Sequence, residues 1–162
     1  MKYLIFFTGL LGLFGCRGDQ VTGANMDQVL HFYVSDAAGV DLLNTANSAA
    51  YSSVVLYDSD ALRDGVTVSA SKKTDSEGRY YLEYVAGATR TLQSGGTAGE
   101  SIYVSNLMVR YLTSASTEIE EDALRLEYEW TSQWFRIKRV FYKGTLVFEK
   151  VEGQPNVIRI VK

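Results

Sequence analysis

Apolar and polar residues alternate along most of the chain after residue 28. In residues 29–34, Leu30, Phe32 and Val34 fall on one face, while His31 and Tyr33 fall on the other. A period of two is that of a β-strand with one buried face. The same alternation recurs in residues 66–71, 79–85 and 124–130, and short apolar runs fill much of the remainder. The pattern predicts a domain built from short strands.

Turn signals separate these segments. Asp75-Ser76-Glu77-Gly78 is typical of a turn, and Lys143-Gly144 lies between two apolar runs. A glycine at the second position of a two-residue loop suits a type I′ hairpin, because glycine adopts positive φ without steric cost. This turn predicts the following facing pairs: Tyr142 with Thr145, Phe141 with Leu146, Val140 with Val147, Arg139 with Phe148, and Lys138 with Glu149.

Eight or nine short strands separated by turns predict an all-β fold, an antiparallel two-sheet β-sandwich of immunoglobulin-like or transthyretin-like type. Residues 74–80 also resemble the turn-and-strand signature of transthyretin-like carrier domains. The acidic segment 116–127 could form a helical turn, but the regular alternation from Leu124 onward favours a loop or edge strand. We expect one domain over residues 28–162.

The N-terminus has the pattern of a signal peptide. One lysine precedes an apolar run over residues 3–14. This run is too short to span a bilayer, which takes about 20 residues, but it suits the hydrophobic region of a signal peptide. Leu13-Phe14-Gly15-Cys16 then resembles a lipobox, with cleavage before Cys16. The alternative is an ordinary secretory signal that leaves a cysteine near the cut.

Cys16 is the only cysteine, so no internal disulfide explains it. Lipidation of Cys16 does explain it. We therefore expect a signal peptide at residues 1–15, a lipidated N-terminus and tether at residues 16–27, and attachment to a membrane of the bacterial cell envelope through acyl chains. The outer membrane is favoured over the inner one, with the domain in the periplasm or at the cell surface. The net charge of −3 gives no indication of nucleic-acid binding.

Several segments together resemble a family of uncharacterised Bacteroidetes lipoproteins with β-sandwich domains. They are the lipobox, Val34-Ser35-Asp36 through Gly39 to Asp41-Leu42-Leu43-Asn44, Val55-Leu56-Tyr57 with Gly65, residues 122–127, and Val140-Phe141-Tyr142-Lys143-Gly144. The chain departs from that pattern at Lys143, where asparagine is expected, and at Thr45, where proline is expected. The resemblance implies an envelope location and a sandwich fold, and it implies no activity.

The residues that usually carry catalysis are scarce. One histidine and one cysteine are too few for a Cys/His zinc site. His31 lies within a predicted strand, which favours a place on a sheet face. Glu118, Glu120 and Glu121 could supply the carboxylate pair of a glycosidase, but solvated charges are the simpler interpretation. Asp58, Asp60 and Asp64 miss the EF-hand spacing, because Arg63 stands at the glycine position, although a looser oxygen cage stays open. We expect no enzyme activity, metal or cofactor.

Two tryptophans flank the segment Trp130-Thr131-Ser132-Gln133-Trp134. Trp130 continues the alternation of Leu124, Leu126 and Tyr128, which predicts a core position. Trp134 shares its phase with Arg136 and Lys138, which predicts exposure. The main hypothesis is a non-enzymatic module that binds an unknown partner or serves structurally. The alternative is glycan binding by Trp134, Gln133 and Asn106, because an aromatic ring beside amide groups can hold a sugar.

Overall fold

The computed structural model describes residues 24–95, 99–113 and 119–162, with the side chain of Ile119 excepted. Twelve strands are present in this part of the chain, and none of its residues lies in a helix that could cross a membrane. The predicted signal peptide, Cys16 and Glu118 lie outside the described residues. The strands are β1 (Asn25–Asp27), β2 (Val29–Ser35), β3 (Tyr51–Asp58), β4 (Thr67–Val68), β5 (Ala70–Thr74), β6 (Tyr80–Val85), β7 (Thr91–Gly95), β8 (Ser101–Thr113), β9 (Ile119–Trp130), β10 (Trp134–Tyr142), β11 (Thr145–Glu149) and β12 (Asn156–Val161).

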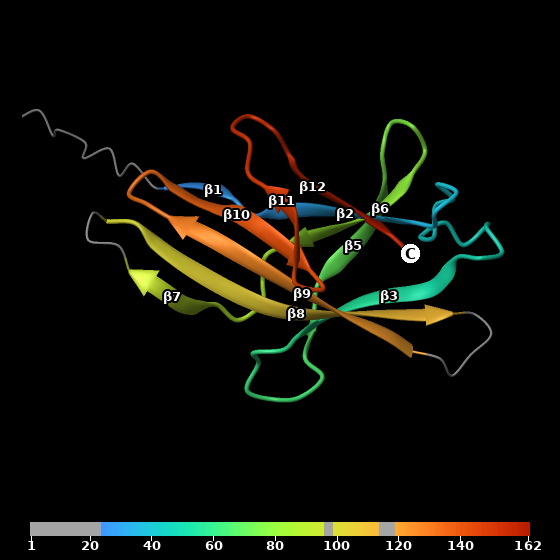
Figure 1. The fold of residues 1–162 in the computed structure, drawn as a ribbon, viewed down its shortest axis with the longest axis horizontal. Coiled ribbons are helices and arrows are strands. Elements are labelled where there is room, and N and C mark those ends of the chain that lie inside the picture. The colour runs from blue at the N-terminus through green and yellow to red at the C-terminus, as the bar shows by residue number, and fades with distance from the viewer. Residues whose placement is uncertain (1–23, 96–98, 114–118) are drawn as a thin grey trace, which may run out of the picture.

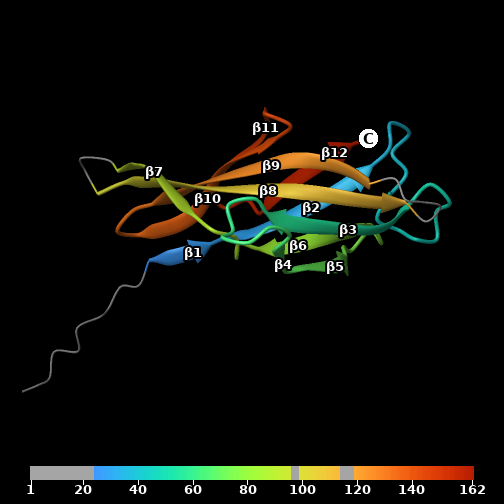
Figure 2. The ribbon, with the colours of Figure 1, turned by 90° about the horizontal axis from the view of Figure 1, so that it is seen from below.

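Two sheets form a sandwich-like arrangement (Figures 1 and 2). The larger, eight-stranded sheet has the order β1-β10-β9-β8-β3-β4, with β11 also beside β10 and β7 also beside β8. The smaller, four-stranded sheet has the order β12-β2-β6-β5. The all-β prediction is confirmed for the described residues.

The prediction of a purely antiparallel sandwich with eight or nine strands is wrong, because both sheets are mixed. β1 pairs in parallel with β10, and β12 pairs in parallel with β2. The paired strands are far apart in the sequence, so no hairpin turn in the sequence predicts their pairing. The extra strands are short. β1, which takes up the last three residues of the predicted tether, has 3 residues, and β4 has 2. Strands of this length are too short for a readable alternation.

The predicted strand over residues 66–71 is divided between the two sheets. Residues 67–68 form β4 and pair with β3 in the larger sheet. Residues 70–74 form β5 and pair with β6 in the smaller sheet. The chain therefore crosses from one layer to the other at Ser69, and the alternation continues through the crossing without a break.

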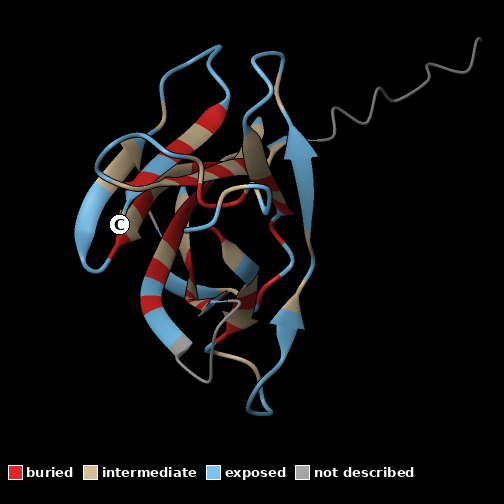
Figure 3. Ribbon diagram, turned by 90° about the vertical axis from the view of Figure 1, so that its right-hand side faces the viewer, coloured by how far each residue is buried: buried red, intermediate tan, exposed pale blue. Residues whose placement is uncertain are grey.

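The core lies between the two sheets and follows the predicted alternation (Figure 3). Leu124 and Leu126 on β9 face Leu30 and Phe32 of β2 across this interior, and all four are nearly fully buried. The longest ladder joins β8 to β9, from Ser101 opposite Trp130 to Leu112 opposite Ile119. This ladder is longer than any strand of the smaller sheet, whose strands have 5 to 7 residues. Its two ends therefore extend beyond the sheet that covers its middle.

The hairpin between β10 and β11 has its predicted tip. Lys143 and Gly144 have φ values of 51° and 78°, as a type I′ turn requires. Tyr142 pairs with Thr145 and Phe141 pairs with Leu146, which confirms the first two predicted pairs.

The three remaining predicted pairs of this hairpin are wrong. The register shifts between Val140 and Phe141, so that Val140 pairs with Phe148 and Arg139 pairs with Glu149. Val147 is the extra residue of this β-bulge. Lys138 forms its ion pair with Glu129 of β9 instead of Glu149. A turn fixes the register only as far as the first bulge, and no residue type in this segment signals where that bulge occurs.

One end of the core is closed by the buried carboxylate of Asp122. Its side chain is 4 % exposed. Asp122 accepts hydrogen bonds from the Tyr142 hydroxyl and from Nζ of Lys162, and Nζ of Lys143 lies 2.9 Å from its Oδ1. The Tyr111 hydroxyl is 2.9 Å from that of Tyr142, and because Tyr142 donates to Asp122, Tyr111 is the donor to Tyr142. Lys162 follows β12, so this cluster links the two sheets.

The other end of the core is closed by Arg90. Its guanidinium carbon lies 5.1 Å from the ring centroid of Tyr128 and 4.9 Å from that of Phe135. The same guanidinium donates to the Gln28 side chain and to the backbone oxygen of Ala86, at 2.6 Å each. A cation on aromatic faces is favourable. Arg90 thus covers apolar rings that the smaller sheet does not reach.

We expect Asp122 to make stability depend on acid pH. Burial alone would raise its pKa, but the hydrogen bonds from Lys162, Tyr142 and Lys143 lower the pKa to about 2, from 3.8. A depressed carboxyl pKa stabilises the fold above pH ~4, and the contribution, about 2 kcal/mol, is lost as the pH falls toward 2. Asp122→Asn should lack this loss and should cost about 3 kcal/mol at pH 7, because Lys162 loses a buried partner.

Urea unfolding of the wild type and of Asp122→Asn between pH 2 and pH 7 measures both effects. Asp64→Asn is the matched control, because Asp64 is an exposed carboxylate in the loop between β3 and β4. It should change stability by less than about 0.5 kcal/mol and leave the pH dependence intact. An unchanged pH dependence in Asp122→Asn would show that Asp122 does not carry it.

Candidate functional site

The two tryptophans lie on either side of a tight hairpin between β9 and β10. The Thr131 N–H donates to the backbone oxygen of Trp134 at 2.8 Å. The Thr131 hydroxyl oxygen accepts from the N–H groups of Gln133 and Trp134, at 3.2 and 3.0 Å. Threonine favours such turns because its short hydroxyl satisfies backbone donors locally. The Asn25 N–H donates to the backbone oxygen of Gln133 at 2.8 Å, which joins β1 to this connection.

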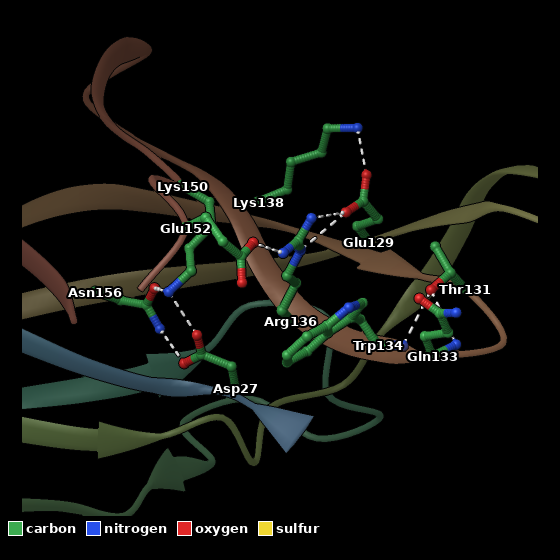
Figure 4. Close-up of polar contacts among 10 residues, drawn as sticks. All are labelled: Asp27, Glu129, Thr131, Gln133, Trp134, Arg136, Lys138, Lys150, Glu152 and Asn156. Atoms are coloured by element: carbon green, nitrogen blue, oxygen red, sulfur yellow. Dashed lines mark hydrogen bonds and ion pairs between the residues drawn. The ribbon is translucent and has the colours of Figure 1, made fainter. Parts of the chain in front are cut away.

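A charged cluster on the outer face of the larger sheet adjoins Trp134 (Figure 4). The Arg136 guanidinium carbon lies 5.5 Å from the centroid of the Trp134 ring system. Arg136 pairs with Glu129 at 2.9 Å and with Glu152 at 2.6 Å, and Lys138 pairs with Glu129 at 2.7 Å. These partners come from β9, β10 and the segment after β11. Trp134 is therefore next to a fixed array of charges.

The carboxylate of Glu129 is held in its ionised form. Only 12 % of its side chain is exposed. Burial by itself would raise the pKa of Glu129, but the hydrogen bonds from Lys138 and Arg136 outweigh burial and lower the pKa below its usual range. Farther along β9, Glu127 is similarly enclosed between Arg125 and Arg139, at 2.8 and 2.7 Å. With its pKa lowered in this way, the Glu129 carboxylate serves as a fixed acceptor rather than as a proton donor.

The segment after β11 is fastened to the N-terminal strands beside this cluster (Figure 4). Nζ of Lys150 contacts the Asp27 carboxylate and donates to the Asn156 side chain at 3.0 Å. The Asn156 amide donates to Asp27 and to the backbone oxygen of Val29, at 2.8 Å each. These contacts hold β1 in place against β10 and keep the base of the hairpin rigid.

A surface hollow of about 440 Å³ opens beside Trp134. Its walls come from the hairpin, from the charged cluster and from the chain before β8, and its lining residues are Gly99, Glu100, Glu129, Thr131, Ser132, Gln133, Trp134 and Arg136. A partly exposed indole, an exposed amide and hydroxyl groups thus share one concave surface. Such a surface suits a polar ligand with an apolar face.

The structure confirms the predicted exposure of Trp134 in part and overturns the predicted burial of Trp130. Trp134 is partly exposed and Gln133 is exposed. Trp130 is 42 % exposed, although its neighbours on the same face, Leu126 and Tyr128, are fully buried. Alternation correctly predicts the face of the sheet but cannot show how far the covering sheet extends. Trp130 is the last residue of β9 and lies past that cover.

Asn106 does not join the other two predicted ligand residues. It pairs with Arg125 on β9, whereas Trp130 pairs with Ser101. Five residues along a strand are about 17 Å, so Asn106 is far from the hollow. Its side chain donates to the Asp60 carboxylate at 2.9 Å, and its backbone oxygen accepts from Ser59 at 2.9 Å. The role of Asn106 is to hold the loop after β3.

The other residues considered for chemistry have structural partners. His31 lies on the outer face of β2, as expected, with Nε2 3.6 Å from the Glu83 carboxylate. The predicted solvated loop charges Glu120 and Glu121 lie in β9 instead and pair with Lys162 and Arg110. Within the described residues no group of three His, Cys, Asp or Glu side chains is arranged to hold a metal ion.

The sequence interpretation missed Glu129 and Arg136 as site residues. A signal was present, because Glu127 and Glu129 precede the hairpin and Arg136 and Lys138 follow it. Treating residues 131–133 as a hairpin loop would have placed Glu129 opposite Arg136, as the structure does. Comparisons of this chain with protein-family models, curated proteins and solved structures found no match.

We expect the fluorescence of both tryptophans to be quenched by acrylamide in the native state. The chain has only two tryptophans, so Trp134→Phe reports on Trp130 and Trp130→Phe reports on Trp134. Trp130 should be quenched more strongly than Trp134, because a larger part of it is exposed. Urea-unfolded samples of each variant give the fully accessible reference. A Trp130 signal that resists quenching would restore the core position that the alternation predicts.

Proposed function

We propose that this chain is a lipid-anchored protein of the bacterial cell envelope whose β-sandwich is a non-enzymatic binding module. The observation that supports the anchor is the sequence Leu13-Phe14-Gly15-Cys16, which follows a short apolar run and contains the only cysteine. β1, the first strand of the described residues, begins at Asn25, nine residues after Cys16. The membrane would thus be reached through acyl chains on Cys16, with the outer membrane favoured.

Binding is favoured over catalysis because the buried carboxylates are held in ion pairs. Glu129, Glu127 and Asp122 are each enclosed by cations and act as fixed structural charges. A general acid needs a proton to give at working pH, and the lowered pKa values of Asp122 and Glu129 oppose this. A rigid surface with a partly exposed indole is suited to recognition.

The anchor is tested by Cys16→Ser in cells fed a labelled fatty acid. We expect the wild type to take up the label and to fractionate with the membrane. Cys16→Ser should lose the label, because no other thiol is available. Thr22→Ala is the matched control in the same segment and should keep the label. Label on Cys16→Ser, or an unlabelled wild type, would contradict the lipoprotein proposal.

A second candidate function is glycan recognition at the hollow beside Trp134. Sugar rings present apolar C–H faces that stack on an indole and hydroxyl groups that need polar partners. The hollow provides the Trp134 ring together with Gln133, Thr131 and Glu129. The anchored protein would then hold a glycan at the envelope. Asn106, which lies elsewhere, is not part of this proposal.

The glycan proposal is tested with a glycan array probed by the wild type, Trp134→Ala and Trp130→Ala. Trp134→Ala should lower binding of every bound glycan by at least about tenfold, or ~1.4 kcal/mol. Trp130→Ala removes the same side chain from a residue that does not line the hollow, and it should bind normally. Thermal melts confirm that both variants fold. Equal binding by folded Trp134→Ala and wild type would remove the hollow as a glycan site.

A further inference from the structure

We propose that the outer face of the four-stranded sheet binds an acidic oligosaccharide. This surface is formed by His31 and Tyr33 of β2, Tyr81 of β6, Lys73 of β5 and Arg159 of β12, and we call it the tyrosine face. It belongs to a different sheet from the hollow beside Trp134. It therefore goes beyond the function proposed above and does not depend on it.

Aromatic rings gather at the centre of the tyrosine face. The Tyr33 and Tyr81 rings are 5.3 Å apart with 29° between their planes, and the His31 ring is 4.6 Å from that of Tyr81. They point away from the core because the alternate residues Phe32 and Leu82 are buried. The Tyr33 hydroxyl donates to Asp75 at 3.2 Å, which fixes this ring. The result is a preformed aromatic surface on two rigid strands.

A cation lies on each side of the tyrosine pair. Arg159 is opposite Tyr33 in the β12–β2 ladder, and Lys73 is opposite Tyr81 in the β5–β6 ladder. The row from β12 to β5 crosses four strands, a span of about 14 Å at ~4.8 Å between strands. An extended ligand lying across the sheet would meet a cation, two tyrosines and a second cation in turn.

The two cations are not equally available. Lys73 forms an ion pair with Glu83 at 2.6 Å. In the described part of the chain Arg159 has no carboxylate partner, and its guanidinium carbon lies 5.2 Å from the Tyr33 ring centroid. A guanidinium placed over an aromatic ring keeps N–H groups free for a carboxylate or phosphate, which it binds in bidentate geometry. Arg159 therefore favours an anionic ligand.

A small hollow of about 110 Å³ lies at the Arg159 end of the row, and it too is bordered by cationic and aromatic side chains. Tyr33, Ser35, Arg79 and Arg159 are among its lining residues. Asp41 also lines it, but both carboxylate oxygens of Asp41 are occupied by backbone N–H groups, of Leu43 at 2.9 Å and of Tyr80 at 2.8 Å. Two arginines border this cavity, which has the size of one acidic group. Arg79 already pairs with Glu77 at 3.0 Å, so Arg159 supplies the charge that is available to a ligand. This is complementary to the charge of a uronate or phosphate.

An acidic sugar chain combines the properties that the tyrosine face selects. Its rings offer apolar faces to Tyr33 and Tyr81, and its carboxylates or phosphates would meet Arg159 and Arg79. A nucleic acid shares the negative charge and the flat rings, and the net charge of −3 of the chain opposes either polyanion alike. Single-stranded nucleic acid is therefore the outcome that the test must separate.

The test measures binding of full-length protein in mild detergent to three probes by calorimetry. The probes are an oligogalacturonate with a carboxylate on each ring, a neutral galactose oligosaccharide of the same length, and a single-stranded DNA oligonucleotide. We expect the oligogalacturonate to bind at least about tenfold more tightly than either of the others. Its affinity should fall as salt is raised, because charge pairs at an exposed surface are screened.

Variants assign the binding to residues. Arg159→Gln should weaken oligogalacturonate binding by at least about tenfold, whereas Arg63→Gln, which removes the same charge from the loop after β3, should not. Tyr81→Ala should abolish binding and Tyr81→Phe should restore it, which separates stacking from folding. The proposal is overturned by equal affinity for the neutral probe, by tighter binding of DNA, or by full binding to Arg159→Gln. A loss seen only in Trp134→Ala would assign the saccharide to the other hollow.

Discussion

The apolar inner face of the long β8–β9 ladder has to be covered, and the sheet that covers it is shorter than the ladder. Burial of this face stabilises the fold, because large apolar side chains contribute in proportion to the area they remove from water. Over the middle of the ladder, β2, β6 and β12 supply the cover with Leu30, Phe32 and Ile158. Past these strands the cover must come from other groups.

At both ends of the core, polar side chains supply this cover. At one end, Asp122 contacts Tyr142, Lys162 and Lys143, and this polar cluster covers the part of the ladder that the smaller sheet does not cover. At the other, Arg90 lies over Tyr128 and Phe135. Beyond Arg90 the smaller sheet does not reach the end of β9, and Trp130 is exposed there. The exposure of Trp130 is thus a consequence of unequal sheet length.

The two proposed recognition surfaces use different chemistry. In the hollow beside Trp134, the nearby cations Arg136 and Lys138 are paired with Glu129 and Glu152, and the exposed Glu100 adds a negative charge, so the hollow does not favour an acidic ligand. On the tyrosine face, Arg159 has no such partner in the described residues and rests on Tyr33. The first surface therefore suits a neutral sugar and the second an acidic one. The tyrosine face is built on strands, which keeps its side chains in position before a ligand arrives.

The sequence alone determined the local features. The period of two identified β2, β6 and the second half of β9, and Lys143-Gly144 identified a hairpin tip with two correct pairs. The first half of β9, where the sequence predicts a loop or edge strand, lies between β10 and β8. Each of the identified features depends on residues close together in the chain, whose conformational preferences act wherever the segment lies. The lipobox at Cys16 is a sequence feature of the same kind and stays a prediction.

Only the tertiary structure decided the features that join distant segments. These features depend on which strand lies beside which and on where each strand ends. They are the parallel pairs β1–β10 and β12–β2, the crossing at Ser69, the exposure of Trp130, and the separation of Asn106 from Gln133. Alternation specifies a face but carries no information about the partner that covers it or about its length. The row Arg159–Tyr33–Tyr81–Lys73 takes one residue from each of four strands, so it exists only after the sheet has formed.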